Sequence, residues 1–153
     1  MIPAEELKRI AAHAASTYPA ECCGLLLADA AGALRFVAID NIAGTAEGVQ
    51  TSARSGRDGY VMHPKQLLKA LQQADEQGGQ LWGIVHSHPD VGAYFSSEDR
   101  HMALGGGAEP LWPGVQYLVV SVRAGRVDGA RIYRWEPSHG DFAESQVTGI
   151  EGI

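Results

Sequence analysis

Apolar residues recur with a helical period in two stretches of the chain. Over residues 3–17, a proline opens the first turn and the apolar residues share one stripe: Leu7, Ile10, Ala11 and Ala14. The second stretch opens at Pro64 and stops at Gly78 and Gly79, and we expect its shared apolar face to consist of Leu67, Leu68, Leu71 and Ala74. Both patterns predict helices that bury one side.

Apolar runs bounded by turn residues predict strands. Residues 22–28 are continuously apolar, and a turn at 29–32 leads to a second run at 34–39, which predicts a hairpin. A further run covers 81–88, and the runs at 116–123 and 126–135, joined through Ala124 and Gly125, predict a closing hairpin. A short helix is expected at 97–104, before three glycines. Residues 41–59 are polar, which predicts a loop, or a loop with a short strand near 50–53.

This mixture of helices and strands, with a hairpin at each end, predicts an α+β or α/β/α sandwich around a mixed, curved sheet. A chain of 153 residues is long enough for one domain with a buried core. We expect that single domain to span residues 1–136. Residues 137–153 show no clear period, and we expect them to form a flexible C-terminal tail.

Charge and hydropathy narrow the expected partners. The net charge of −6 argues against nucleic acid, because phosphate binding requires clustered lysines and arginines. No apolar run is long enough to span a bilayer, and charged residues within 1–20 argue against a signal peptide. We therefore expect a cytoplasmic protein that binds neither nucleic acid nor membrane.

The two cysteines, Cys22 and Cys23, are adjacent in the sequence. A disulfide between neighbouring residues is geometrically unfavourable, and on a strand the two thiols point to opposite faces. We interpret them as buried, reduced side chains in a reducing compartment rather than as a redox pair.

Two histidines stand at the end of the run at 81–88. Because side chains alternate along a strand, His86 and His88 point to one face while Ser87 points away. Pro89 has no backbone N–H for a continuing ladder, which predicts that the strand ends there. The two imidazoles would then lie together at an open strand end.

A serine and an aspartate follow at short range. Seven residues separate His88 from Ser96, and Asp99 comes three positions later. Two imidazoles and one carboxylate make three protein ligands, the number that leaves zinc an open fourth position in a catalytic site. The spacing of Ser96 and Asp99 is also that of a helix capping box, and the two roles are compatible.

This arrangement resembles the JAMM metalloproteases, also called MPN+, JAB or Mov34 proteins. Their pattern is a distant glutamate, then His-Ser/Thr-His-Pro, then a serine and an aspartate at the spacing found here. The upstream glutamate matches Glu21 within residues 19–27 (PAECCGLLL), a stretch similar to that of compact prokaryotic members. Residues 60–64 (YVMHP) match the family's aromatic residue and proline before a central helix. Phe95 departs from the proline that many relatives carry before the serine.

The resemblance covers roughly residues 1–135 and implies a fold, a cofactor and roles for individual residues. The implied fold is a cytidine-deaminase-like α/β/α sandwich, the MPN or JAB domain. The implied cofactor is Zn²⁺, held by His86, His88 and Asp99. Glu21 is implied as the general base, and Ser96 as a hydrogen-bond donor to the oxyanion of the tetrahedral intermediate.

The implied reaction is hydrolysis of an amide or isopeptide bond after the Gly-Gly tail of a ubiquitin-like or β-grasp sulfur-carrier protein. Residues 105–114 are too few for the insertion with which some relatives grip a second ubiquitin. Two alternatives remain, a non-catalytic MPN scaffold and a RadC-like protein linked to DNA metabolism. Presence of all five site residues counts against the scaffold, and the acidic charge counts against the RadC-like protein.

Overall fold

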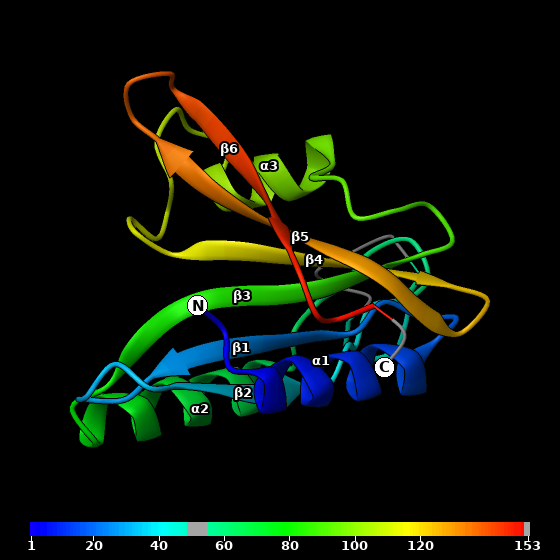
Figure 1. Cartoon of the computed structure of the whole chain (residues 1–153), viewed down its shortest axis with the longest axis horizontal. Helices are drawn as coiled ribbons and strands as arrows, with labels where there is room; N and C mark the ends of the chain where they lie inside the picture. The colour runs from blue at the N-terminus through cyan, green and yellow to red at the C-terminus, as the bar shows by residue number, and fades with distance from the viewer. Residues whose placement is uncertain (49–54, 152–153) are drawn as a thin grey trace.

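A six-stranded sheet organises the molecule, with strands in the order β2-β1-β3-β4-β5-β6 (Figure 1). The structure is a computed structural model, and it describes residues 1–48 and 55–151. Its elements are α1 (Ala4–Thr17), β1 (Cys23–Ala28), β2 (Leu34–Ile39), α2 (Pro64–Glu76), β3 (Gln80–Pro89), α3 (Ser97–Leu104), β4 (Gln116–Arg123), β5 (Arg126–Glu136) and β6 (Asp141–Val147). The short strand considered near residues 50–53 lies outside the described residues.

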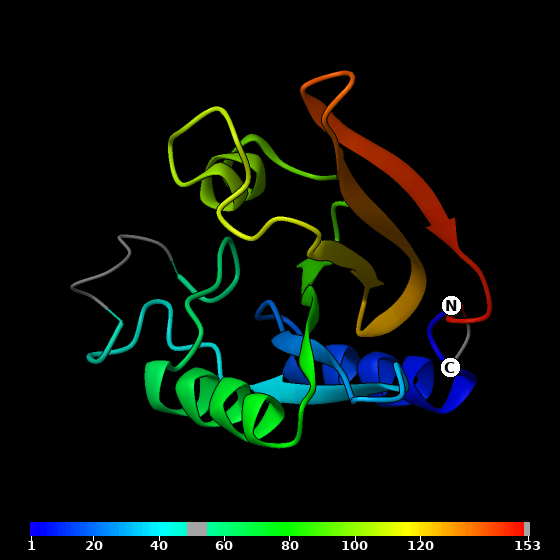
Figure 2. The same cartoon turned by 90° about the vertical axis from the view of Figure 1, so that its left-hand side faces the viewer.

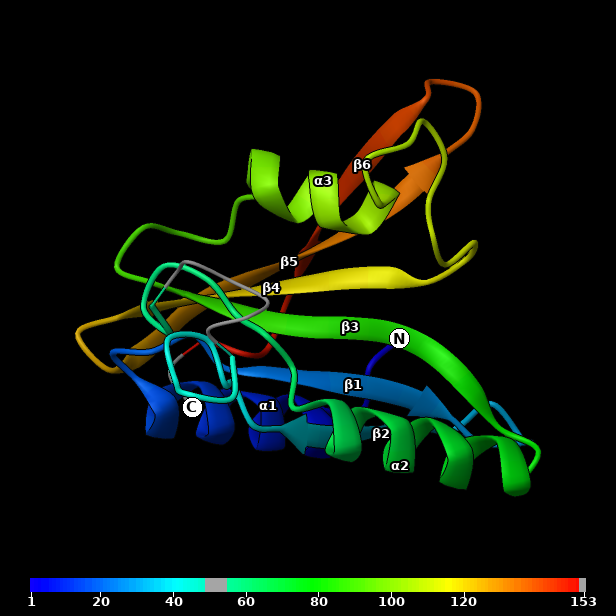
Figure 3. The ribbon, with the colours of Figure 1, turned by 180° about the vertical axis from the view of Figure 1, so that it is seen from behind.

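The sheet is mixed and carries helices on both faces. β3 pairs with β4 in parallel, and the other neighbouring strands pair antiparallel. Figure 2 shows α1 and α2 on either side of the strands. The face covered by α2 also carries α3, which packs over β4 and β5 (Figure 3). The predicted α+β sandwich around a mixed sheet is therefore confirmed.

The two cysteines confirm the predicted alternation at the start of β1. Cys22 packs in the core beneath α1, whereas Cys23 packs in the core beneath α2. Both are free thiols, and burial raises the pKa of Cys22 to about 12 and raises that of Cys23 as well. These thiols are inert parts of the core.

The apolar face of α2 differs from the prediction at one position. Leu68 is 57% exposed, whereas Ala70 and Ala74 are buried and Leu67 and Leu71 pack against the same core. Positions 67, 70, 71 and 74 follow the helical repeat, and Leu68 lies about 100° away from Leu67 around the axis. Within the described part of the chain, no helix combines the length and apolar character needed to cross a membrane.

The segment predicted as a flexible tail forms a strand instead. β6 pairs with β5 along its length, and beyond it Ile150 is fully buried against the α1 side of the core. The prediction was wrong because β6 is an edge strand with few apolar residues, and pairing with β5 stabilises it more than its own pattern suggests. A domain boundary at residue 136 stays a prediction.

Candidate active site

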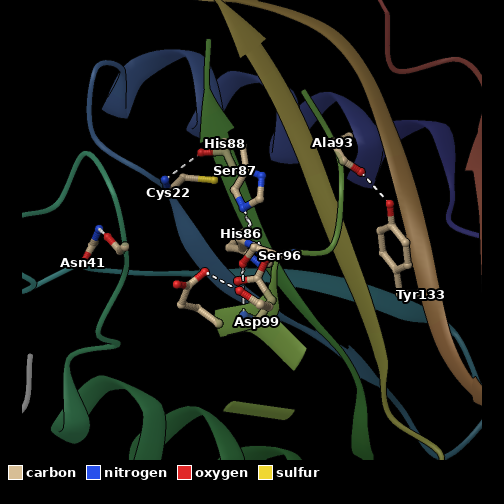
Figure 4. Close-up of polar contacts among 12 residues, drawn as sticks. Cys22, Asn41, His86, Ser87, His88, Ala93, Ser96, Asp99 and Tyr133 are labelled. Carbon is tan, nitrogen blue, oxygen red and sulfur yellow. Dashed lines mark hydrogen bonds and ion pairs between the residues drawn. The ribbon is translucent and has the colours of Figure 1, made fainter. Parts of the chain in front are cut away.

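The C-terminal end of β3 presents both histidines to one face of the sheet. β3 lies between β1 and β4 at the centre of the sheet and ends at Pro89, as predicted. Ser87 points away, and its Oγ accepts the backbone N–H of Cys22 at 2.8 Å. Figure 4 shows His86 and His88 beside Ser96 and Asp99 at this end of the strand.

The first turn of α3 holds the aspartate. Ser96 is the N-cap of α3, and its Oγ accepts the N–H of Asp99 at 3.0 Å. In return, Oδ2 of Asp99 accepts the N–H of Ser96 at 2.9 Å, which completes the predicted capping box. The box fixes the aspartate rotamer and turns its carboxylate toward the histidines.

Donor atoms of three residues converge between β3 and α3. Nε2 of His86 lies 3.2 Å from Nε2 of His88 and 3.2 Å from Oδ1 of Asp99. Nε2 of His88 lies 3.4 Å from Oδ2 of Asp99. Tetrahedral zinc with bonds of about 2.0–2.1 Å separates its ligand atoms by about 3.3 Å, so the spacing of this group fits such an ion. The cluster could therefore hold a metal ion.

The hydrogen bond that His88 makes away from the cluster suits a metal site. Nδ1 of His88 lies 3.1 Å from the carbonyl oxygen of Gly92, which can only accept, so Nδ1 carries the proton and Nε2 faces the cluster with a lone pair. Burial lowers the pKa of His86 and favours its neutral form. Burial acts the same way on His88, but the hydrogen bond to Asp99 and the charge of Glu21 outweigh it and raise the pKa.

The carboxylate of Asp99 remains ionised in this setting. Burial opposes its charge, but the contacts with His86 and His88 outweigh that effect and lower the pKa of Asp99 well below its usual range. Two imidazoles and one ionised carboxylate form a donor set that zinc binds.

Glu21 lies on the same cleft although it comes from a distant part of the sequence. It sits between α1 and β1 and is only 6% exposed. Its N–H donates to the carbonyl of Gly56 at 2.6 Å, and its own carbonyl accepts Nδ2 of Asn41 at 3.0 Å. The cleft has a volume of about 840 Å³, and its lining includes Glu21, His88, Ser96 and Asp99. His86 lies behind this lining.

Three aromatic residues support the cluster, and the sequence assigned none of them a place in the site. Tyr60 stacks on the ring of His86 with centroids 4.8 Å apart, and Tyr94 packs on His88 at 4.9 Å. Phe95, where the sequence departs from its relatives, stacks on Tyr133 at 4.9 Å and anchors the loop before Ser96. For Tyr60, the only indication in the sequence was its match to the aromatic residue of the family's pattern in the YVMHP segment.

Solved structures share this architecture. A protein from Salinibacter ruber is 27% identical, with a TM-score of 0.62 over 96% of this chain and 90% of the other. Protein DSY2949 from Desulfitobacterium hafniense is 22% identical, with a TM-score of 0.67 over 93% of this chain and 86% of the other. The second likeness shows the fold alone.

Sequence comparison identifies the family. The desampylase of Haloferax volcanii is 32% identical over 108 residues, which cover 71% of this chain and 67% of the relative. The family described as prokaryotic homologs of the JAB domain matches residues 3–136, a span that contains Glu21, both histidines, Ser96 and Asp99. The chain therefore belongs to the prokaryotic JAB-domain family.

Proposed function

We propose that this protein is a zinc-dependent peptidase that hydrolyses the amide or isopeptide bond after the Gly-Gly tail of a ubiquitin-like or sulfur-carrier protein. One observation carries the proposal: the donor atoms of His86, His88 and Asp99 meet at tetrahedral spacing beside a cleft that Glu21 and Ser96 also line. One relative is named desampylase, a name for an enzyme that removes a ubiquitin-like modifier, and this likeness supports the choice of substrate.

Each proposed role follows from where the side chain lies. His86, His88 and Asp99 would hold Zn²⁺, which when bound would lower the pKa of water and polarise the scissile carbonyl. Glu21 would take a proton from the attacking water and deliver it to the departing amine. The bond that Ser96 Oγ accepts from the backbone fixes its position, from which the hydroxyl would donate to the developing oxyanion.

The surroundings of the cleft favour a protein substrate with a slender tail. Val91, Tyr94 and Met102 line the cleft and are each more than half exposed, and Trp112 is exposed in the loop after α3. Exposed apolar groups at the rim of a site commonly mark a protein-binding surface. Glycines would let an extended tail approach the cluster closely, and main-chain pairing with a strand edge would hold it.

The test is hydrolysis of a defined conjugate. The purified protein is incubated with a Gly-Gly adduct of a β-grasp protein, and released amine is measured with zinc, with chelator, and after zinc is restored. We expect cleavage that chelator stops and zinc restores. A conjugate whose penultimate glycine is replaced by valine should resist cleavage, because a β-branched side chain would clash in a narrow groove. Zinc binding without cleavage of any Gly-Gly adduct would instead support the scaffold alternative.

A further inference from the structure

We propose that Asp90 is a positioning residue that ties the segment carrying Glu21 to the strand carrying His88, an inference that rests on the function proposed above. Asp90 follows β3 directly and lines the cleft. Its φ of 65° lies in the left-handed region, which few residues other than glycine adopt and which aspartate tolerates better than most. The chain therefore turns sharply just beyond the candidate metal ligands.

The carboxylate of Asp90 joins three segments of the chain. Oδ1 accepts the backbone N–H of Ala124, in the turn between β4 and β5, at 2.9 Å. Oδ2 accepts the hydroxyl of Tyr18 at 2.9 Å and lies 3.6 Å from the guanidinium of Arg57. Hydrogen bonds to an ionised acceptor are stronger than neutral ones, so these contacts define the geometry of the turn.

Two of these partners flank Glu21. Tyr18 lies three residues before it, in the connection between α1 and β1. Arg57 follows Gly56, whose carbonyl accepts the N–H of Glu21 at 2.6 Å. One contact of Oδ2 therefore acts on the backbone that leads into the proposed general base, and the other acts on the segment that accepts its backbone N–H.

The other side of Glu21 is fixed independently of Asp90. The N–H of Cys22 donates to Ser87 Oγ at 2.8 Å, between the two histidines of β3. Loss of the Asp90 contacts would loosen only the N-terminal side of Glu21 and would leave β1 and β3 paired. Misplacement of a catalytic group by about 1 Å can cost roughly 100-fold in rate. We therefore expect an effect on kcat rather than on KM or zinc affinity.

Conservative variants isolate this contact. Tyr18→Phe removes the hydroxyl and keeps the ring, and Asp90→Asn removes the charge while asparagine tolerates the same backbone conformation. Asp29→Asn is the matched control, because Asp29 Oδ1 accepts the N–H groups of Ala31 at 2.9 Å and Ala33 at 2.8 Å in the turn after β1 and does not line the cleft. Each variant is assayed for kcat, KM, zinc affinity and amide hydrogen exchange of Ala20 and Glu21.

We expect Tyr18→Phe and Asp90→Asn each to lower kcat about tenfold, because a small shift of the base costs rate steeply. KM and zinc affinity should stay unchanged, and exchange of the Ala20 and Glu21 amides should accelerate. The double variant should lose less than the product of the single losses, because both changes break the same contact. Asp29→Asn should change none of these readouts.

Three results would overturn the inference. One is unchanged exchange of the Ala20 and Glu21 amides in Tyr18→Phe, whether or not the conjugate is cleaved. Another is an unchanged kcat in both variants of an active enzyme. The third is weakened zinc binding, since Asp90 would then act through His88. If the wild-type protein cleaves no Gly-Gly conjugate, only the proposed function is refuted, because amide hydrogen exchange still reports on the contact between Tyr18 and Asp90.

Discussion

The two walls of the cleft are built in different ways. One wall consists of the end of β3 and the start of α3, where His86, His88 and Asp99 lie close in sequence and contact one another directly. The other wall includes Glu21 and Tyr60, which come from distant segments of the chain. Backbone hydrogen bonds, such as the one from Glu21 to Gly56, hold these segments together.

Because of this difference, the two proposed tasks, metal binding and proton transfer, depend on different parts of the chain. The wall with the candidate metal ligands is a local unit, fixed by strand alternation and a helix cap, and its donor atoms already lie together in the structure. The wall that carries Glu21 depends on long-range contacts through Asn41 and Gly56. Metal binding and proton transfer should therefore respond to different substitutions.

The largest effect is expected from loss of a donor on the local wall. Asp99→Ala removes one of three proposed ligands and should weaken zinc binding by more than the roughly 10–100-fold that loss of an outer-sphere partner costs. Calorimetric titration of zinc checks this, with Asp29→Asn as the control. The apo protein should stay folded, because its apolar core does not depend on the metal. Undiminished affinity in Asp99→Ala, His86→Ala and His88→Ala would refute the assignment of the metal site.

The next effect concerns the distant wall. Glu21→Gln keeps the size and hydrogen-bonding reach of the side chain but cannot transfer protons, so kcat should fall by about 10²–10⁴-fold. Zinc affinity should match the wild type. Single-turnover cleavage and zinc titration of the same preparation measure both quantities. If Glu21→Gln loses zinc instead, the two walls are not separable and Glu21 is a ligand.

Ser96 caps α3 and also lines the cleft, and its loss should lower kcat less than the loss of Glu21 does. Ser96→Ala removes the proposed oxyanion donor and should lower kcat by about 10²–10³-fold. It also removes the N-cap of α3, which should lower the free energy of unfolding by about 1 kcal/mol. Ser96→Thr keeps a capping hydroxyl and should retain stability. Urea denaturation and cleavage assays of both variants separate the cap from the donor.

The contrast between a wall built from neighbouring residues and a wall built from distant segments also explains what the sequence could predict. Period-two alternation placed His86 and His88 on one face, and the capping pattern of Ser96 and Asp99 gave the start of α3. Both signals are local, so they survive without knowledge of the fold. The proximity of Glu21 to this cluster followed from family resemblance and not from any property of residues 19–27 alone.

The contacts that the sequence missed are long-range. The YVMHP pattern marks an aromatic residue at position 60 but does not indicate that its ring stacks on His86, because the loop before α2 and the end of β3 meet only in the folded chain. The strand β6 was not predicted for the same reason, because it is stabilised by pairing with β5 and by ring contacts such as that of Phe142 with Phe95. Pairing partners and ring contacts are decided by the whole fold, which a single-strand pattern does not encode.

The smallest expected effect tests how the loop before Ser96 is held from behind. The hydroxyl of Tyr133 lies 2.8 Å from the carbonyl oxygen of Ala93 and 3.0 Å from Oε2 of Glu144, both of which can accept its proton, so Tyr133→Phe should lower the free energy of unfolding by about 1 kcal/mol. Tyr117 is the matched control: its hydroxyl is buried and has no hydrogen-bond partner within residues 1–48 and 55–151, so Tyr117→Phe should leave stability equal or higher. Urea denaturation measures both. Equal losses in the two variants would mean that the Tyr133 hydroxyl contributes nothing specific to this loop, and that its ring stacking on Phe95 suffices to hold it.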